Sequence, residues 1–184
     1  MKFTKYEKLG AYHWTLYEAH TQYRTHVDRV VSWLSEDNIL DVGAGDGVIT
    51  YLLKAKGVDD EPSAVELAKE KGADVVLADA YSLPFPDSSF DSILMCDVLE
   101  HFEYPEKALR EAYRVAKSYL YVVTPVQYVK GKISDEFHYQ EWSPEELNML
   151  VEPVGFTLIE NIVVSEVNTQ YAKFKKNALN NNPL

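Results

Sequence analysis

Short apolar runs alternate with helical patterns from residue 38 onward. The apolar runs predict strands at 39–42, 56–59, 74–77, 92–96, 119–124 and 156–164. Apolar residues at helical spacing predict helices over 47–54, 62–71, 105–116 and 144–151. Pro62, Pro105 and Pro144 suit first helical turns, and Ser143 with Glu146 has the spacing of a capping box. This alternation predicts a mostly parallel sheet with helices on both faces and a site at the carboxyl ends of the strands.

The two ends of the chain have a different character. Residues 1–36 are rich in aromatic residues and histidine, with apolar residues at helical spacing from Val27 to Leu34, which predicts one or two helices that form a cap. Residues 37–172 carry the alternating pattern and are the expected core. Residues 173–184 end in an Asn-rich stretch, and we expect a frayed tail there.

Composition indicates one domain spanning residues 1–184, since single domains commonly have about 100 to 200 residues. Cys96 is the only cysteine, so no internal disulfide can form, and no apolar run approaches the roughly 18 residues that cross a bilayer. We therefore expect a cytoplasmic protein without a membrane partner. The pattern carries no signal of an oligomeric state.

Charge is unevenly distributed. The formal net charge is −11, but the first 30 residues carry +2 and residues 173–184 carry +3, so the segment between them carries −16. An acidic protein repels phosphate backbones and anionic lipids at long range. Nucleic acid is therefore not expected as the main partner.

The most informative segment is Ile39-Leu40-Asp41-Val42-Gly43-Ala44-Gly45-Asp46-Gly47, a strand that runs into three alternate glycines and a helix. Glycines allow the backbone to turn sharply and approach a ligand closely. A dinucleotide site would read G-x-G-x-x-G, whereas Val48 stands where the third glycine belongs, which argues against an NAD oxidoreductase. Asp41 and Asp46 disfavour a pyrophosphate and suit a ligand with an ammonium group.

This string resembles the first motif of class I S-adenosylmethionine (SAM)-dependent methyltransferases, and the chain is similar to the small type 11-like methyltransferases. The likeness continues in order through residues 38–164, including Ala78-Asp79-Ala80, Asp97-Val98-Leu99-Glu100-His101 and Glu141-Trp142-Ser143-Pro144. The resemblance implies an α/β, Rossmann-like sheet of seven mostly parallel strands that ends in an antiparallel hairpin. It also implies methyl transfer from SAM, with S-adenosylhomocysteine (SAH) as the product.

The resemblance assigns residues to the cofactor. Gly43, Ala44 and Gly45, after Asp41, would lie against the amino acid and ribose of SAM. Asp59 would accept both ribose hydroxyls; because the second strand is short, Asp60 or Glu61 are alternatives. The remaining assignments are Asp79 and Ala80 to adenine, Leu83 and Phe85 near the base, and Cys96 and Asp97 beside the sulfonium.

Assignments on the acceptor side are more open. Tyr12, His13, Trp14 and Tyr17 would line an acceptor pocket or pack as core, and residues 125–141 are long enough for a lid. The candidate catalytic residues are Asp97, His101 and His138.

A divalent metal is a further alternative. Asp97, Glu100 and His101, with His138 later in the chain, resemble the metal site of ubiquinone-pathway O-methyltransferases and small-RNA 2′-O-methyltransferases. Here the first ligand is the shorter Asp, and a Leu-Glu-His at this position also occurs in family members without metal. We predict O- or N-methylation of a small molecule. The alternatives are a metal-assisted 2′-O-methyltransferase acting on an RNA end and a non-catalytic SAM-binding protein.

Overall fold

The computed structural model describes residues 5–129 and 133–178. The chain begins with α1 (Lys5–Leu9), α2 (Tyr12–Ala19) and α3 (Thr21–Trp33). The prediction of one or two helices was therefore wrong. Gly10 has a φ of +65° after α1, and His20 is extended between α2 and α3, so each position interrupts the helical backbone.

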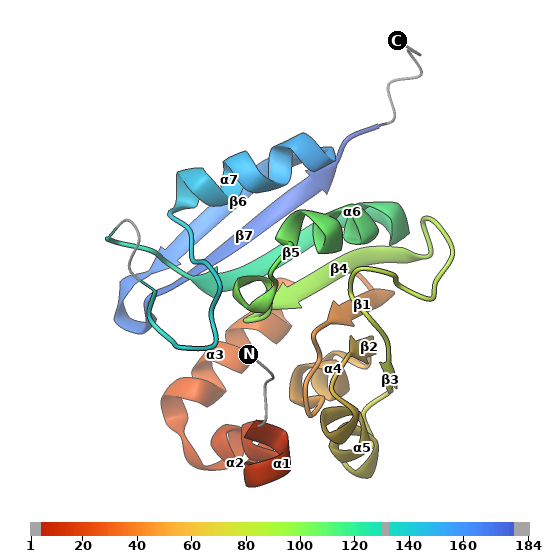
Figure 1. Cartoon of the computed structure of the whole chain (residues 1–184), viewed down its shortest axis with the longest axis vertical. Coiled ribbons are helices and arrows are strands. Elements are labelled where there is room, and N and C mark those ends of the chain that lie inside the picture. Colours follow the sequence, from red (N-terminus) through yellow and green to blue (C-terminus); the bar gives the residue numbers. More distant parts are fainter. Residues whose placement is uncertain (1–4, 130–132, 179–184) are drawn as a thin grey trace.

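The sheet has seven strands among the described residues (Figure 1). They are β1 (Ile39–Val42), β2 (Lys56–Asp59), β3 (Val75–Leu77), β4 (Phe90–Cys96), β5 (Ala116–Pro125), β6 (Phe156–Val164) and β7 (Thr169–Lys176). Their order is β3-β2-β1-β4-β5-β7-β6; β1 to β5 pair in parallel, and β7 runs antiparallel to β5 and β6. The predicted Rossmann-like α/β class is confirmed.

The connecting helices begin where local signals predict. They are α4 (Val48–Leu53), α5 (Pro62–Glu70), α6 (Pro105–Val115) and α7 (Pro144–Val151), with short 3₁₀ turns at Leu99–His101, Glu152–Val154 and Ser165–Val167. The Ser143 hydroxyl accepts from the Glu146 N–H at 3.2 Å, and the Glu146 carboxylate accepts from the Ser143 N–H at 3.0 Å, which forms the predicted capping box. No helix within the described residues is long and apolar enough to cross a membrane.

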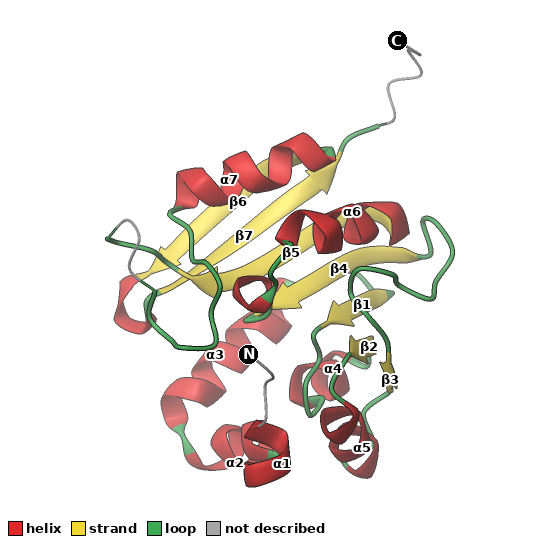
Figure 2. Ribbon diagram, in the orientation of Figure 1, coloured by secondary structure: helices red, strands yellow, loops and turns green. Residues whose placement is uncertain are grey.

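Helices cover both faces of the sheet (Figure 2). Along β4, Ile93 and Met95 join a core with α6 and α7, whereas Leu94 and Cys96 join a second core with α3 and α4. This alternation follows from the two-residue repeat of a strand. The N-terminal helices are thereby attached to the face on which Cys96 lies.

Strand β7 corrects the expectation of a frayed tail from residue 173. Phe174 is fully buried between Leu120 of β5 and Leu158 of β6, while Lys173 lies 3.7 Å from Glu36. Along this lysine-rich segment, side chains alternate between a buried and a solvated side of the strand. The lysines made the segment look like a polar tail in the sequence. Residues 179–184 lie outside the described residues.

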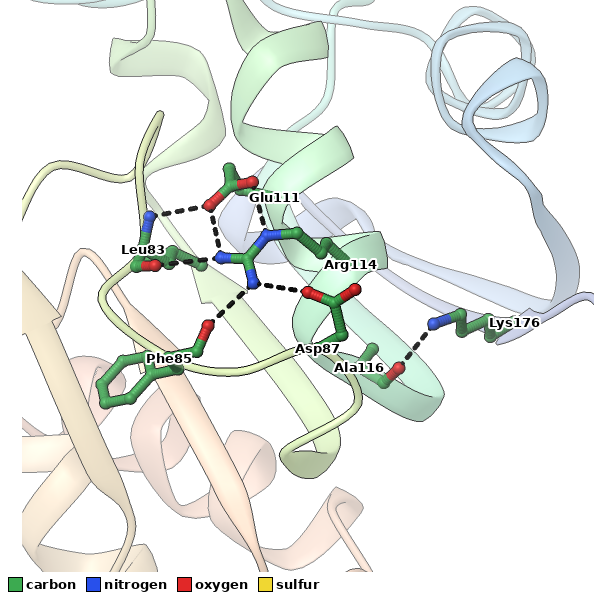
Figure 3. A network of polar contacts seen from close by, with 7 residues as sticks. All are labelled: Leu83, Phe85, Asp87, Glu111, Arg114, Ala116 and Lys176. Carbon is green, nitrogen blue, oxygen red and sulfur yellow. Dashed lines mark hydrogen bonds and ion pairs between the residues drawn. The ribbon is translucent and has the colours of Figure 1, made fainter.

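An arginine fixes the segment between β3 and β4 (Figure 3). Arg114 of α6 donates to the carbonyl oxygens of Leu83 and Phe85 at 2.9 and 2.7 Å and to Asp87 at 2.9 Å. Its guanidinium also forms a two-point contact with Glu111, at 2.7 and 2.8 Å. This planar fork connects the segment to the helix through several charge-assisted hydrogen bonds.

Candidate active site

A cavity of about 730 Å³ opens at the carboxyl ends of the parallel strands. The glycine loop leaves β1 on one side of it, and Asp97 follows the neighbouring strand β4. Strand β1 lies between β2 and β4, so the strand order reverses direction at β1. Sheets of this kind bind ligands at this switch point. The cavity therefore lies where the strand order predicted it.

The glycine loop brings bare backbone to the cavity wall. Gly43, Gly45 and Gly47 have φ values of +77°, +56° and +81°, a region that favours glycine. The N–H groups of Gly43 and Ala44 both donate to the Val58 carbonyl at 2.9 Å, which ties the loop to β2. A β-carbon built on Gly43 would lie 2.2 Å from Val98 Cγ2, so a side chain is excluded there.

The two aspartates of the loop motif have different surroundings. Asp41 lines the cavity, is buried, and accepts a 2.6 Å hydrogen bond from Thr50; burial raises its pKa to about 6. Asp46 does not line the cavity. Its carboxylate accepts from the His13 N–H at 2.9 Å, and its carbonyl accepts from Trp14 Nε1 at 2.7 Å. Asp46 thus fastens α2 to the loop, which corrects the idea that it faces an ammonium group.

Asp59 ends β2 beside the glycine loop. Its Oδ2 accepts from the Gly45 N–H at 2.8 Å, and its Oδ1 accepts from the Glu61 N–H at 2.9 Å. Burial raises the pKa of Asp59 to about 6, although these two hydrogen bonds favour the carboxylate. Asp60 and Glu61 also line the cavity, and Glu61 caps α5 through Ser63.

The segment after β3 forms the next part of the wall. Asp79, Ala80 and Tyr81 line the cavity, and Asp79 accepts from the Tyr81 N–H at 2.8 Å. Leu83 and Phe85 do not line it; Leu83 is buried in the core, and Phe85 packs edge-on against a neighbouring phenylalanine with 4.9 Å between ring centres. Their expected position near a base is therefore wrong, because the arginine network directs this segment toward α6.

The N-terminal helices close one side of the cavity. Tyr12 and His13 line it, with ring centres 4.0 Å apart, and His13 stacks on Tyr23 of α3 at 5.8 Å. Trp14 and Tyr17 do not line it: Trp14 packs on Tyr51 and Tyr17 donates to Asp28. Of the four residues expected either to line an acceptor pocket or to pack as core, two line the cavity and two pack elsewhere.

Several cavity or cavity-adjacent residues received no site assignment from the sequence, among them Lys5, Tyr6, Tyr23 and His26. Tyr23 and His26 share helical spacing with the buried Val27 and Val30, so the inward stripe of α3 was the signal that would have found them. Lys5 and Tyr6 lie on a helix of five residues, which is too short for a periodic pattern.

The segment between β5 and α7 covers the cavity from the other side. Asp135, Phe137 and Tyr139 line it, and the Tyr139 N–H donates to the Glu100 carbonyl at 2.8 Å. Lys5 Nζ lies 3.9 Å from Asp135 and 5.0 Å from the centre of the Phe137 ring. Helix α1 and this segment therefore meet across the cavity, in the manner of the predicted lid.

The metal ligands predicted from the sequence do not form a set of four. Ligand atoms of Glu100, His101 and His138 lie within 4.8 Å of one another, and Asp97 belongs to a different group. Asp97 has a φ of +50° and precedes the 3₁₀ turn Leu99–His101, so the spacing of an α-helix does not apply to it. Asp97 as a shared ligand was therefore wrong, although it lines the cavity with His101 and His138.

The three grouped side chains have donor types that suit a divalent ion. Glu100 is buried and accepts from Thr124 at 2.9 Å, and burial raises its pKa well above the ordinary value. His101 Nδ1 lies 3.1 Å from the Phe137 carbonyl, and His138 Nδ1 lies 2.7 Å from Glu141. Outer oxygen partners of this kind orient metal-binding imidazoles. The fit is partial, since only three of the four expected donors come together.

Comparisons with known proteins agree with this architecture. Residues 40–123 match the model of a methyltransferase domain. A demethylmenaquinone methyltransferase of Thermotoga maritima is 28% identical in an alignment that covers 71% of this chain and 71% of that protein. A chloroplastic 2-methyl-6-phytyl-1,4-hydroquinone methyltransferase of Oryza sativa subsp. japonica is 34% identical over 91 residues, but these span only 27% of that protein.

The solved structure of a SAM-dependent methyltransferase from Thermotoga maritima, described as a possible histamine N-methyltransferase, is 26% identical. It aligns with 93% of this chain and 98% of its own, with a TM-score of 0.77. The glycine loop at the switch point of a seven-stranded sheet with one antiparallel strand defines a Rossmann-like ligand-binding fold. The chain belongs to the class I SAM-dependent methyltransferases. The predicted family and enzyme class are thus confirmed.

Proposed function

We propose that this protein transfers the methyl group of SAM to a small-molecule acceptor that carries no anionic group. One observation supports this most directly: a single cavity joins the glycine loop and Asp59 to an aromatic wall of Tyr12, His13 and Tyr23. The first wall suits the donor and the second suits an acceptor. During transfer the bond from sulfur to the methyl carbon breaks, the sulfur keeps that electron pair, and the acceptor's lone pair forms the new bond.

Each part of SAM has a candidate partner. The backbone from Gly43 to Gly45 would lie against the amino acid and ribose, and Asp59 would accept both ribose hydroxyls. Asp79 would accept a hydrogen bond from the adenine amino group, and the Ala80 N–H would contact the adenine ring. Cys96, which lines the cavity with Asp97, would border the sulfonium as a small apolar neighbour, since burial raises the pKa of its thiol well above the ordinary value.

Charge selects the class of acceptor. Among the described cavity residues, Lys5 is the one lysine or arginine, against eight carboxylates. These are Asp41, Asp59, Asp60, Glu61, Asp79, Asp97, Glu103 and Asp135. Such a wall tolerates the positive sulfonium and repels a phosphate backbone, which argues against an RNA end. The names of the Thermotoga and rice relatives, which concern demethylmenaquinone and a hydroquinone, support a small acceptor.

The proposal is tested by binding and by transfer. Calorimetry should show binding of SAM and no binding of NAD, and tight NAD binding would overturn the donor assignment. Labelled methyl from SAM should then appear on members of a panel of amines, hydroxylated aromatics and sugars, and not on RNA. Binding of SAM without transfer to any compound would favour a non-catalytic protein.

A metal is not required by this proposal. We expect methyl transfer to an identified acceptor to be unchanged, within about twofold, after exhaustive treatment with EDTA, because the donor is already activated by its positive sulfur. The alternative outcome is a metal-assisted reaction, in which Glu100, His101 and His138 would hold the ion. Loss of transfer with EDTA, restored by a divalent ion and abolished in His138→Ala, would establish the metal-assisted reaction instead.

The pKa of Asp59 predicts how donor binding depends on pH. Burial raises the pKa values of Asp41 and Asp59 to about 6, above the roughly 3.9 of an unfolded chain. The folded free protein therefore binds more protons between about pH 4 and 6, and its unfolding free energy falls as pH rises through that window. SAM binding should respond oppositely, because ribose hydroxyls need an ionised Asp59 as acceptor. We expect calorimetry to show about tenfold tighter binding at pH 7 than at pH 5, a dependence that Asp59→Asn should reduce.

A further inference from the structure

Asp97 presents a carboxylate to the cavity from a fixed position. Its Oδ2 lies 2.9 Å from His26 Nε2 and 3.4 Å from Cys96 Sγ, and its N–H donates to the Val123 carbonyl at 2.8 Å. The side chain is nevertheless 44% exposed and lines the cavity. Among the described residues, the hydrogen bonds to the Asp97 carboxylate all reach Oδ2, and none reaches Oδ1. One oxygen is thus held by the protein, while the other is available to a ligand.

The backbone of Asp97 is held in a strained conformation. Its φ of +50° lies in the left-handed region, which is unfavourable for a non-glycine residue and which aspartate tolerates better than most. Such strain persists where the surroundings determine the conformation. Here the strand partner Val123 and the side-chain partner His26 both do so.

His26 holds Asp97 from behind. Its Nδ1 lies 2.8 Å from the Tyr171 hydroxyl and its Nε2 faces Asp97, so both ring nitrogens are engaged and the ring orientation is fixed. The His26 side chain is 11% exposed and does not line the cavity. It can therefore act on a ligand only indirectly, mainly through Asp97 at 2.9 Å and more weakly through Cys96 Sγ at 3.8 Å.

The pair also controls charge. The partial loss of water around Asp97 in the cavity wall would by itself raise its pKa, but His26 outweighs this effect and the pKa is below the ordinary value. Burial alone would lower the pKa of His26, but Asp97 outweighs it and the pKa is above the ordinary value. The cavity therefore receives an ionised carboxylate at neutral pH.

Strand order sets the location of this carboxylate relative to a donor. Asp59 ends β2 and Asp97 follows β4, with β1 and its glycine loop between them. Val98, the next residue after Asp97, packs directly on Gly43. A ligand that extends from Asp59 across the loop therefore has its far end next to Asp97.

We propose that Asp97 receives the proton-bearing nitrogen or oxygen of the methyl acceptor, and that His26 is a positioning residue that orients Asp97 for this contact. The inference rests on the proposed function, and it adds a substrate class: an amine or a neutral hydroxyl compound whose N–H or O–H donates to Asp97. Within a wall of eight carboxylates, an amine is favoured. The amine attacks in its neutral form, so a protonated amine first gives one proton to solvent, and its remaining N–H donates to Asp97. A hydroxyl acceptor gives its proton to Asp97, and from there to solvent, as the new C–O bond forms.

Two known analogues test the contact without the acceptor. Sinefungin carries an amine on the carbon that replaces the methylated sulfur of SAM, whereas SAH has no such group. We expect calorimetry to show sinefungin binding at least about tenfold more tightly than SAH, as a charge-assisted hydrogen bond to Asp97 would give. Asp97→Asn should bring this ratio close to one and leave SAH affinity within about threefold.

The variant His26→Gln tests whether His26 orients Asp97 or only stabilises the fold. At pH 7 the preference for sinefungin should fall about threefold, and at pH 6 it should fall further, because Asp97 without the imidazolium begins to take up a proton. The wild-type ratio should be the same at both pH values. His20→Gln, at the exposed start of α3, is the matched control and should change nothing. The titratable groups that interact electrostatically with Asp97 include His26, Tyr23, His13, Cys96, Glu100, His101 and Tyr171.

The outcomes are distinct. An unchanged ratio in Asp97→Asn, or equal loss of SAH and sinefungin, overturns the inference, and equal loss would mean that Asp97 binds the amino acid part of the donor. Similar wild-type affinities for both analogues overturn it while the proposed function stands. If the wild type binds neither, the proposed function fails and the inference with it.

Discussion

Replacing Asp59 by alanine should weaken SAM binding by roughly a hundredfold or more. Each Asp59 oxygen already accepts one backbone N–H, from Gly45 or Glu61, and each has a second lone pair for a ribose hydroxyl. Hydrogen bonds to a charged group contribute about 1.5 to 3 kcal/mol each, and about 1.4 kcal/mol corresponds to a factor of ten. The alanine also leaves two loop N–H groups without their acceptor. Calorimetry with SAM measures the effect directly.

Two further variants make the Asp59 result interpretable. Asp74→Ala removes an exposed aspartate that pairs with Lys56 on the same sheet, and it should leave SAM affinity within about twofold. Asp59→Asn keeps the size of the side chain and should give an intermediate loss. An unchanged affinity in a folded Asp59→Ala would move the ribose contact to Asp60 or Glu61, which line the same wall.

Local signals explain why much of the fold was predictable. The glycine loop, the helices that begin at Pro62, Pro105 and Pro144, and the capping box of α7 each depend on residues a few positions apart. Backbone restrictions act at that range, so a sequence reveals them. The switch point then follows from strand order, and with it the side of the sheet that carries the cavity.

The parts of the site that the sequence did not predict depend on contacts between residues far apart in the sequence. His26 reaches Asp97 and Tyr171, separated from it by 71 and 145 residues. Asp97 does not lie on the predicted helical face, because its own backbone is left-handed and turns the chain. The neighbouring residues in the sequence do not predict that conformation. Strand β7 was missed for a similar reason, since the burial of Phe174 between lysines becomes evident only once its two partner strands are known.

Those distant contacts share one element, the N-terminal cap. Tyr6, His13, Tyr23 and His26 come from α1, α2 and α3, and each meets the cavity or a residue that lines it. Under the proposed function, the core residues of the cavity would bind the donor, and the cap supplies most of the aromatic wall. If the proposed function holds, we expect specificity for the acceptor to depend on how the cap is seated on the glycine loop.

Gly45→Ala should unseat the cap and test this dependence. A β-carbon at Gly45 would lie 2.1 Å from the Tyr6 hydroxyl oxygen, and Gly45 has a φ of +56°. Tyr6 is buried and cannot move aside without moving α1. We expect the unfolding free energy to fall by about 2 to 4 kcal/mol and SAM affinity to fall by at least about tenfold, from backbone strain together with lost aromatic packing. Chemical denaturation and calorimetry measure the two effects.

Gly10→Ala is the matched control, because Gly10 has a φ of +65° and nothing within 4 Å of a built β-carbon. It carries the backbone strain without the collision, so it should cost only about 1 kcal/mol and leave SAM affinity unchanged. Adding Tyr6→Phe to Gly45→Ala should restore part of the loss, since the nearest remaining ring carbon lies 3.2 Å away. Equal effects of the two glycine substitutions would mean that Tyr6 does not rest on the loop in solution.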